Sequence, residues 1–172
     1  MIIRATKKVL NINRIKPLKK DIELSEGLPG EWFVDLVSLG RQGKFALQYL
    51  HNPTRISVIV PGRSIKKNYK TFQDRVTHFL RRHGYEKLIP HYQLDSQPEI
   101  LATNNRSILT HLNQIKWNVE YHCSRYDVKD SIDLDWIEDI FLDYLYTTKT
   151  TGSRYIKVKE VLDEYLEKIS NG

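Results

Sequence analysis

Residues 31–61 of the chain read EWFVDLVSLGRQGKFALQYLHNPTRISVIVP, three apolar runs separated by two short polar turns. In the first run Trp32, Val34 and Leu36 fall on alternate positions, which is the two-residue period of a β-strand. Residues 40–43 divide the first run from the second, and the turn HNPT divides the second from the third. Connections this short join antiparallel neighbours. The stretch therefore predicts three consecutive strands in an antiparallel meander.

The segments outside this meander predict one short strand before it and mainly helices after it. Residues 2–6 are β-rich, and the polar stretch that follows can form only a brief helix before Pro17. A further short strand is expected at 99–103, and Asn104 or Asn105 and then Asp133 are the expected N-caps of two later helices. The apolar positions that predict four helices are Phe72, Val76, Phe79 and Leu80; Ile108, Leu112, Ile115, Val119 and Cys123; Leu134, Ile137, Phe141 and Leu145; and Val161, Leu162, Tyr165 and Ile169.

This order of elements favours an α+β protein over a parallel βαβ sheet, because strands come first and helices follow. We expect an antiparallel sheet from the N-terminal half, packed against helices mainly from the C-terminal half. A chain of 172 residues buries about 70% of its unfolded surface, so residues 1–172 are expected to form a single domain.

The composition narrows the class of protein further. A single cysteine, Cys123, excludes an internal disulfide and any zinc site built from cysteine pairs. The apolar runs are far shorter than the roughly 20 residues that cross a bilayer. We therefore expect a cytoplasmic protein with no membrane contact.

The formal net charge of +6 is unevenly distributed along the chain. Residues 1–86 hold 17 Lys and Arg against 7 Asp and Glu, whereas residues 87–172 hold 10 against 14. The favoured explanation is that the acidic half partly covers the basic half, and the alternative is a basic face for phosphate. Asp135, Asp139 and Asp143 form an acidic ridge along one predicted helix face, so we expect a cationic partner on the same chain or on a second copy.

The predicted helix before Gly84 has a basic outer face and is the main functional candidate. Its apolar stripe must face the core, so its cations point to solvent together. We expect this face to bind nucleic-acid phosphate weakly and without base specificity. The residues proposed for this contact are Arg63, Lys66, Lys67, Lys70, Arg81 and Arg82.

The start of the helix at Asn105, Arg106 and Ser107 is a candidate anion site, because free N–H groups at a helix N-terminus combine there with a guanidinium. Simple capping is the structural alternative. Arg106 and His111 also have the Arg-x4-His spacing of one class of helical ribonucleases, but a hydrogen-bonded His111 at the edge of the core is favoured. His111 and His122 lie about 16 Å apart along a helix, too far to share a metal. We expect no catalytic residue, metal or cofactor.

Several stretches spread over nearly the whole chain resemble a bacterial family of small α+β domains of unknown function. They are MIIRATKKVL at the start, the tryptophan hairpin, the helix opening TNNRSILTHLN and the segment 152–155. The family pattern corresponds here to a Thr-Lys-Lys turn at 6–8, a hairpin with Trp32 and an Asn-Arg-Ser helix start at 105–107. The chain departs from the family at His111, where the usual residue is small. The resemblance implies the architecture and the candidate anion site, and no activity.

Three functions remain open at this point. The favoured one is a non-catalytic module that binds nucleic-acid phosphate through its basic face. The second is a protein-interaction or regulatory domain, with self-association of the basic and acidic faces as one form. The third is a small nuclease or hydrolase that would use Arg106 and His111.

Overall fold

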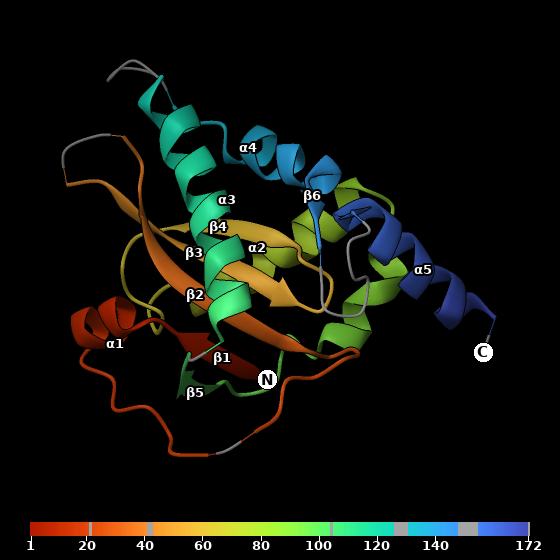
Figure 1. The fold of residues 1–172 in the computed structure, drawn as a ribbon, viewed down its shortest axis with the longest axis horizontal. Helices are drawn as coiled ribbons and strands as arrows, with labels where there is room; N and C mark the ends of the chain where they lie inside the picture. Colours follow the sequence, from red (N-terminus) through yellow and green to blue (C-terminus); the bar gives the residue numbers. More distant parts are fainter. Residues whose placement is uncertain (21, 41–42, 104, 126–130, 148–154, 172) are drawn as a thin grey trace.

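A five-stranded sheet lies at the centre of the computed structural model, which describes residues 1–20, 22–40, 43–103, 105–125, 131–147 and 155–171 (Figure 1). The spatial order of the strands is β4-β3-β2-β1-β5. The predicted meander is confirmed, because β2 pairs antiparallel with β3 and β3 pairs antiparallel with β4. The strands span Ile2–Ala5 (β1), Glu31–Ser38 (β2), Phe45–Asn52 (β3), Ser57–Pro61 (β4) and Glu99–Ala102 (β5).

The α+β class is confirmed, but the sheet is mixed rather than purely antiparallel. Strand β1 runs parallel to both of its neighbours, β2 and β5. Parallel neighbours need a crossover of a dozen or more residues, and the chain between Ala5 and Glu31 is long enough to supply one. Its first part is helix α1 (Lys7–Asn13). Alternation of apolar residues shows which face a strand buries, whereas it carries no information on the direction of the neighbouring strand.

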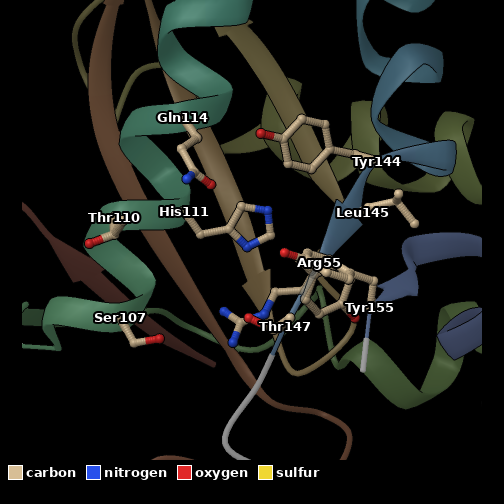
Figure 2. Close-up of a pocket in the computed structure, with 10 residues that line it drawn as sticks. Arg55, Ser107, Thr110, His111, Gln114, Tyr144, Leu145, Thr147 and Tyr155 are labelled. Carbon is tan, nitrogen blue, oxygen red and sulfur yellow. The ribbon is translucent and has the colours of Figure 1, made fainter. Parts of the chain in front are cut away.

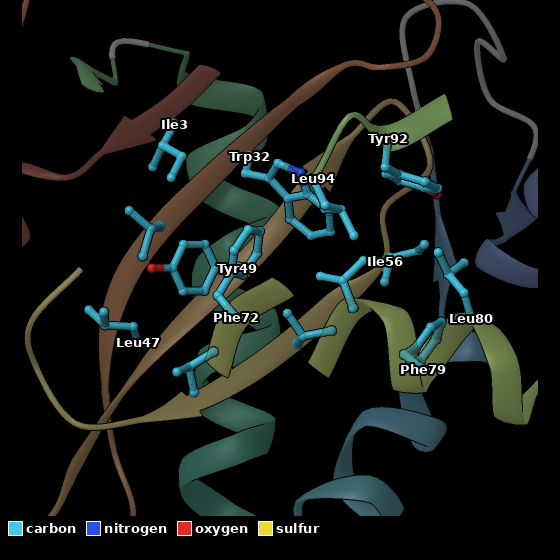
Figure 3. Packing of buried hydrophobic residues seen from close by; sticks show 14 of the residues in the cluster. Ile3, Trp32, Leu47, Tyr49, Ile56, Phe72, Phe79, Leu80, Tyr92 and Leu94 are labelled. Atoms are coloured by element: carbon cyan, nitrogen blue, oxygen red, sulfur yellow. The ribbon is translucent and has the colours of Figure 1, made fainter. Parts of the chain in front are cut away.

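One face of the sheet is covered by α1, α2 (Tyr69–Arg82), the 3₁₀ helix η1 (Glu86–Tyr92) and α5 (Val158–Ser170). The predicted stripe of α2 is buried against this face as expected. Aromatic rings form the centre of this layer (Figure 3): Trp32 meets Phe72 edge-on at 5.0 Å, and Tyr49 lies 4.2 Å from Phe72 between ring centres. Edge-on and offset pairs of this kind stabilise a core beyond their buried area.

The opposite face is covered by α3 (Arg106–Ser124), with α4 (Leu134–Ile140) beside it (Figure 1). The five apolar positions predicted for α3 are all buried. Both expected N-caps are present: the Asn105 side chain accepts a hydrogen bond from the Ile108 N–H at 3.0 Å, and Asp133 accepts one from Trp136 at 2.9 Å. Asn104 lies outside the described residues.

The third predicted helix ends earlier than expected. Helix α4 stops at Ile140, a 3₁₀ turn η2 (Phe141–Asp143) follows, and β6 (Leu145–Tyr146) pairs antiparallel with β7 (Ile156–Lys157). Tyr144 has extended backbone, so Leu145 is not helical although its spacing matches a helix. None of the helices described for this chain combines the length and the apolar character that a bilayer crossing needs.

Candidate anion-binding site

The basic helix α2 and the acidic helix α4 pair with each other. The Arg75 guanidinium lies 2.7 Å from Asp135 and 2.7 Å from Glu138, and Arg82 lies 2.6 Å from Asp139 and 3.2 Å from Glu138. Glu138 is fully buried and also accepts a hydrogen bond from the backbone of β4. These pairs fix α4 to α2 and β4. The third member of the acidic ridge, Asp143, pairs with Lys157 at 3.2 Å. All three members are thus matched within the chain, and association of a second copy through the charged faces stays a prediction.

The other cations proposed for nucleic acid are closer to solvent than Arg82, which is engaged in this ion cluster. The Arg63 guanidinium stacks over the Phe45 ring, 4.2 Å from its centre, and Lys70 pairs with Asp74 at 2.8 Å. Three further cations are exposed and make no ion pair within the described part of the chain: Lys66, Lys67 and Arg81.

The residues of the predicted anion site at the start of α3 divide into three roles. Asn105 caps the helix, which is the role expected if this segment is not an anion site. The Arg106 side chain is exposed. Ser107 instead lines a cavity of about 430 Å³ between α3 and the segment that carries β6 (Figure 2). The structure therefore links the predicted helix start to a cavity that sequence analysis did not find.

The cavity contains a buried arginine, Arg55, at the turn between β3 and β4. The backbone N–H of Arg55 donates to the His51 carbonyl at 2.8 Å, and its φ of 62° places it in the left-handed region. Thr54, one residue earlier, is held on the core by hydrogen bonds with His51 and Tyr92, at 2.7 and 3.1 Å. This tight turn directs the Arg55 side chain away from bulk water, so only 7% of the residue is exposed.

The Arg55 guanidinium lacks the partners that a buried cation normally has. Neither Nε nor Nη1 has a hydrogen-bond partner among the residues that the structure describes. Among these residues, none that lines the cavity is acidic. The guanidinium lies 5.7 Å from the centre of the Tyr146 ring, a cation–π contact. Burial lowers the pKa of Arg55, which means that its charge is poorly solvated.

His111 projects from α3 into the same space (Figure 2). Its ring centre lies 5.2 Å from that of Tyr146 and 5.8 Å from that of Tyr144. Only 8% of His111 is exposed, and its Nε2 has no hydrogen-bond partner in the described part of the chain, unlike the hydrogen-bonded histidine expected from the sequence. Burial, with a smaller contribution from the Arg55 charge, lowers the pKa of His111 to about 4. His111 is therefore neutral at pH 7.

The two walls of the cavity differ in chemistry. The α3 wall carries hydroxyl and amide groups from Ser107, Thr110 and Gln114, and the opposite wall is rich in tyrosine (Figure 2). The buried hydroxyl of Tyr146 also lacks a partner among the described residues, and burial raises its pKa. The remaining lining residues are Tyr144, Leu145, Thr147 and Tyr155.

This arrangement suits an anion. A guanidinium, an imidazole and a phenol with unmet hydrogen-bonding capacity converge in a space that is partly screened from water, where charge-assisted hydrogen bonds are strong. Elsewhere in the described residues, no group of three His, Cys, Asp or Glu side chains is placed to hold a metal ion.

Ser107 and His111 of this site are recognisable in the sequence, whereas Arg55 and the tyrosines of the opposite wall are not, for identifiable reasons. The HNPT turn was interpreted only as a hairpin connection, although the arginine that follows it stands between two apolar strands. The helix predicted through Leu145 includes Tyr144, and its stripe does not mark either Tyr144 or Tyr146 as a site residue. The residues that carry the family resemblance are mostly structural: Thr6 caps α1 and donates to Asp35 at 2.7 Å, and Trp32 is buried in the core.

Comparison with known proteins agrees with the resemblance found in the sequence. A search of curated proteins finds no similar sequence. A family model described as "Domain of unknown function (DUF6933)" matches residues 2–160, which include every strand of the sheet and all residues of the cavity. The chain therefore belongs to the DUF6933 family of domains of unknown function.

Proposed function

We propose that this protein binds a small ligand with a phosphate or carboxylate group in the Arg55 cavity, without converting it. The observation that carries the proposal is the buried Arg55 guanidinium, whose Nε and Nη1 have no partner among the described residues. Burying a guanidinium costs several kcal/mol unless a counter-charge and hydrogen bonds offset the cost. An anionic ligand supplies both.

The surrounding groups support binding of an anion. The N–H groups of a guanidinium match two oxygens of a carboxylate or phosphate in a fork. Ser107 adds a hydroxyl in the first turn of α3, where the helix dipole favours negative charge. Neutral His111 can donate one further hydrogen bond.

We propose binding rather than turnover because His111 is poorly matched to general-base catalysis. A general base works best when its pKa is near the working pH, whereas the pKa of His111 is about 4. Arg106 is the exposed first residue of α3, five positions before His111, and does not line the cavity. These observations support the nuclease alternative less than a binding role.

The test is an NMR titration of the ¹⁵N-labelled protein with inorganic phosphate and, separately, with acetate. We expect saturable shifts confined to the amides of residues 54–56, 107–111 and 144–147. Arg55→Met should abolish them, because it removes the charge and the donors while keeping an unbranched side chain.

Arg14→Met is the matched control. Arg14 is also an arginine with positive φ, 53°, but its side chain is exposed. Shifts that persist in Arg55→Met, or that spread over the exposed lysines instead, would contradict the proposal.

A second candidate function, the binding of nucleic-acid phosphate, is supported by the exposed cations along α2. Lys66, Lys67 and Arg81 are available to solvent, with Arg63 and Lys70 beside them, and α2 separates the two ends of this set by about 20 Å. About four phosphate contacts would give a slope of log affinity against log salt of roughly −3 to −4.

Fluorescence anisotropy with labelled single-stranded and double-stranded DNA at increasing salt tests this candidate. The triple variant Lys66→Gln, Lys67→Gln, Lys70→Gln should flatten the slope. The control triple variant changes three exposed lysines elsewhere to Gln: Lys87, Lys159 and Lys168. Equal slopes for the two variants would remove the nucleic-acid candidate and favour a protein-interaction role for the charged surface.

A further inference from the structure

We infer that the ligand of the Arg55 cavity carries a flat ring and hydroxyl groups beside its anionic group, and that it is a nucleoside monophosphate. This inference rests on the proposed function and adds the class of ligand. It follows from four properties of the cavity: its size, its charge, its polar wall and its tyrosine-rich wall.

The size of the cavity exceeds what a lone anion needs. A volume of about 430 Å³ lies in the range of roughly 300–1,000 Å³ that is typical of sites for small organic molecules. Arg55 and His111 are buried, whereas Leu145 and Tyr155 of the same lining are exposed. A ligand held there by its anionic group therefore extends along both walls towards the opening.

The charge of the lining matches one phosphate group. Arg55 is the one side chain among the described lining residues with a permanent charge, and neutral His111 adds a hydrogen-bonding group rather than a charge. The other titratable groups that face the site are the phenols of Tyr144, Tyr146 and Tyr155. The single charge of Arg55 balances most of the charge of a monophosphate, whereas a triphosphate would keep a large uncompensated charge in a partly buried site.

The two walls match the two remaining parts of a nucleotide. Ser107, Thr110 and Gln114 offer hydroxyl and amide groups along α3, which suit the hydroxyls of a ribose. On the opposite side Tyr155 is 67% exposed and Leu145 is 53% exposed. Large apolar side chains exposed at the edge of a cavity are suited to contact a ligand ring, and tyrosine stacks on any nucleobase without sequence preference.

Isothermal titration calorimetry with five probes tests this assignment: adenosine 5′-monophosphate (AMP), ribose 5-phosphate, inorganic phosphate, adenosine and benzoate. We expect AMP to bind tightest, ribose 5-phosphate at least fivefold more weakly and inorganic phosphate more weakly again. Adenosine should bind at least tenfold more weakly than AMP, because it has no phosphate group to contact Arg55.

Two variants locate the ring. Tyr155→Leu and Tyr144→Leu should each weaken AMP binding about fivefold or more, since a base stacked on an aromatic side chain contributes roughly 1–3 kcal/mol, and should weaken the binding of inorganic phosphate by a smaller factor. Tyr121→Leu is the control, because Tyr121 is an exposed tyrosine of α3 outside the cavity. A 5′-phosphorylated oligonucleotide should bind no tighter than AMP, and tighter binding that depends on Arg55 would overturn the assignment to free nucleotides.

The failure of this inference can be distinguished from failure of the proposed function. If AMP binds no better than ribose 5-phosphate, or if benzoate binds better than AMP, the nucleotide assignment is wrong while the anion site stands. If no probe binds in an Arg55-dependent manner, the proposed function fails together with the inference.

Discussion

Arg55 combines two features that each cost folding free energy. Its guanidinium is buried without an acidic neighbour among the described lining residues, and its backbone adopts the left-handed conformation that non-glycine residues rarely take. Stability and binding should therefore respond in opposite directions when Arg55 is changed.

Arg55→Met is expected to raise the free energy of unfolding by about 1 kcal/mol or more, because replacing a buried charge by an apolar side chain of similar length is often stabilising. In a chain of this size that corresponds to a rise in Tm of roughly 2–4 °C per kcal/mol. Differential scanning calorimetry measures the change. Arg14→Met should leave Tm nearly unchanged. A fall in Tm comparable to that of a core truncation would show that Arg55 supports the fold instead.

The lowered pKa of His111 predicts that the stability of the protein depends on pH. Its pKa is about 4 in the folded protein against 6.5 for an ordinary histidine, so the unfolded chain binds more protons between these values. The contribution of neutral His111 is complete above pH 6.5 and is lost as the pH falls from 6.5 to 4, by an amount on the order of 3 kcal/mol. Buried His51, whose pKa is lowered to about 3 by burial, acts in the same direction.

Urea denaturation of wild type and His111→Gln across this interval provides the test. The variant should lose stability less steeply with falling pH, because one of the two buried histidines no longer takes up a proton on unfolding. His91→Gln, at an exposed site, is the control. Parallel curves for all three proteins would contradict the buried neutral state of His111.

At the level of elements, α4 is attached to α2 and β4 through one buried carboxylate. The Glu138 carboxylate forms ion pairs with both Arg75 and Arg82. It also accepts a hydrogen bond from the backbone N–H of Ile59 at 2.7 Å. Residues 141–147, which supply the tyrosine wall of the cavity, continue directly from α4. The ion cluster therefore helps to place one wall of the candidate site.

Glu138→Gln should destabilise the protein by about 1 kcal/mol, because it removes the carboxylate that Arg75 and Arg82 share, while Asp135 and Asp139 still pair with these guanidinium groups. The side-chain oxygen of Gln can still accept the hydrogen bond from Ile59, so the loss of stability measures the effect of removing the negative charge. Urea denaturation should show a lower midpoint with an unchanged slope. Glu164→Gln removes an exposed carboxylate and serves as the control, with an expected change within about 0.5 kcal/mol. Equal midpoints for the two variants would exclude an anchoring role for Glu138.

At the level of the whole molecule, the crossover from β1 returns to the sheet at Gly30, next to the β3–β4 turn. Gly30 has a φ of 65°, and a side chain there would overlap the Asn52 carbonyl and the His51 ring. The same turn carries Arg55, so this close approach connects the crossover to the support of the candidate site. Only glycine meets both the conformational and the steric requirement.

Gly30→Ala is expected to cost about 3 kcal/mol or more, from the left-handed backbone together with displacement of the neighbouring strand end. It should also weaken anion binding, because the β3–β4 turn must move. Gly27→Ala is the matched control in the same crossover, where an added Cβ meets no atom within 4 Å. Thermal unfolding of both variants provides the measurement, and a Gly30→Ala protein as stable as Gly27→Ala would contradict the close approach.

Local patterns in the sequence were enough to predict the elements and the faces they bury. Two-residue alternation identified the meander of β2, β3 and β4, and helical spacing identified the buried stripes of α2 and α3. The N-caps Asn105 and Asp133 were predictable because capping depends on residues three positions apart. Each of these patterns involves only residues that are close together in the sequence.

The direction of β1, the partners of Arg82 and the composition of the cavity depend on contacts between residues far apart in sequence. Arg55, His111 and Tyr146 come from a hairpin turn, a helix and a short strand, and each belongs to an unremarkable local pattern. Their convergence is set by where α3 crosses the sheet and by the end of α4 at Ile140, which returns the chain towards that helix. An arginine in a turn is ordinarily solvated, and the packing of these distant segments is what buries Arg55 and turns it into a candidate binding group.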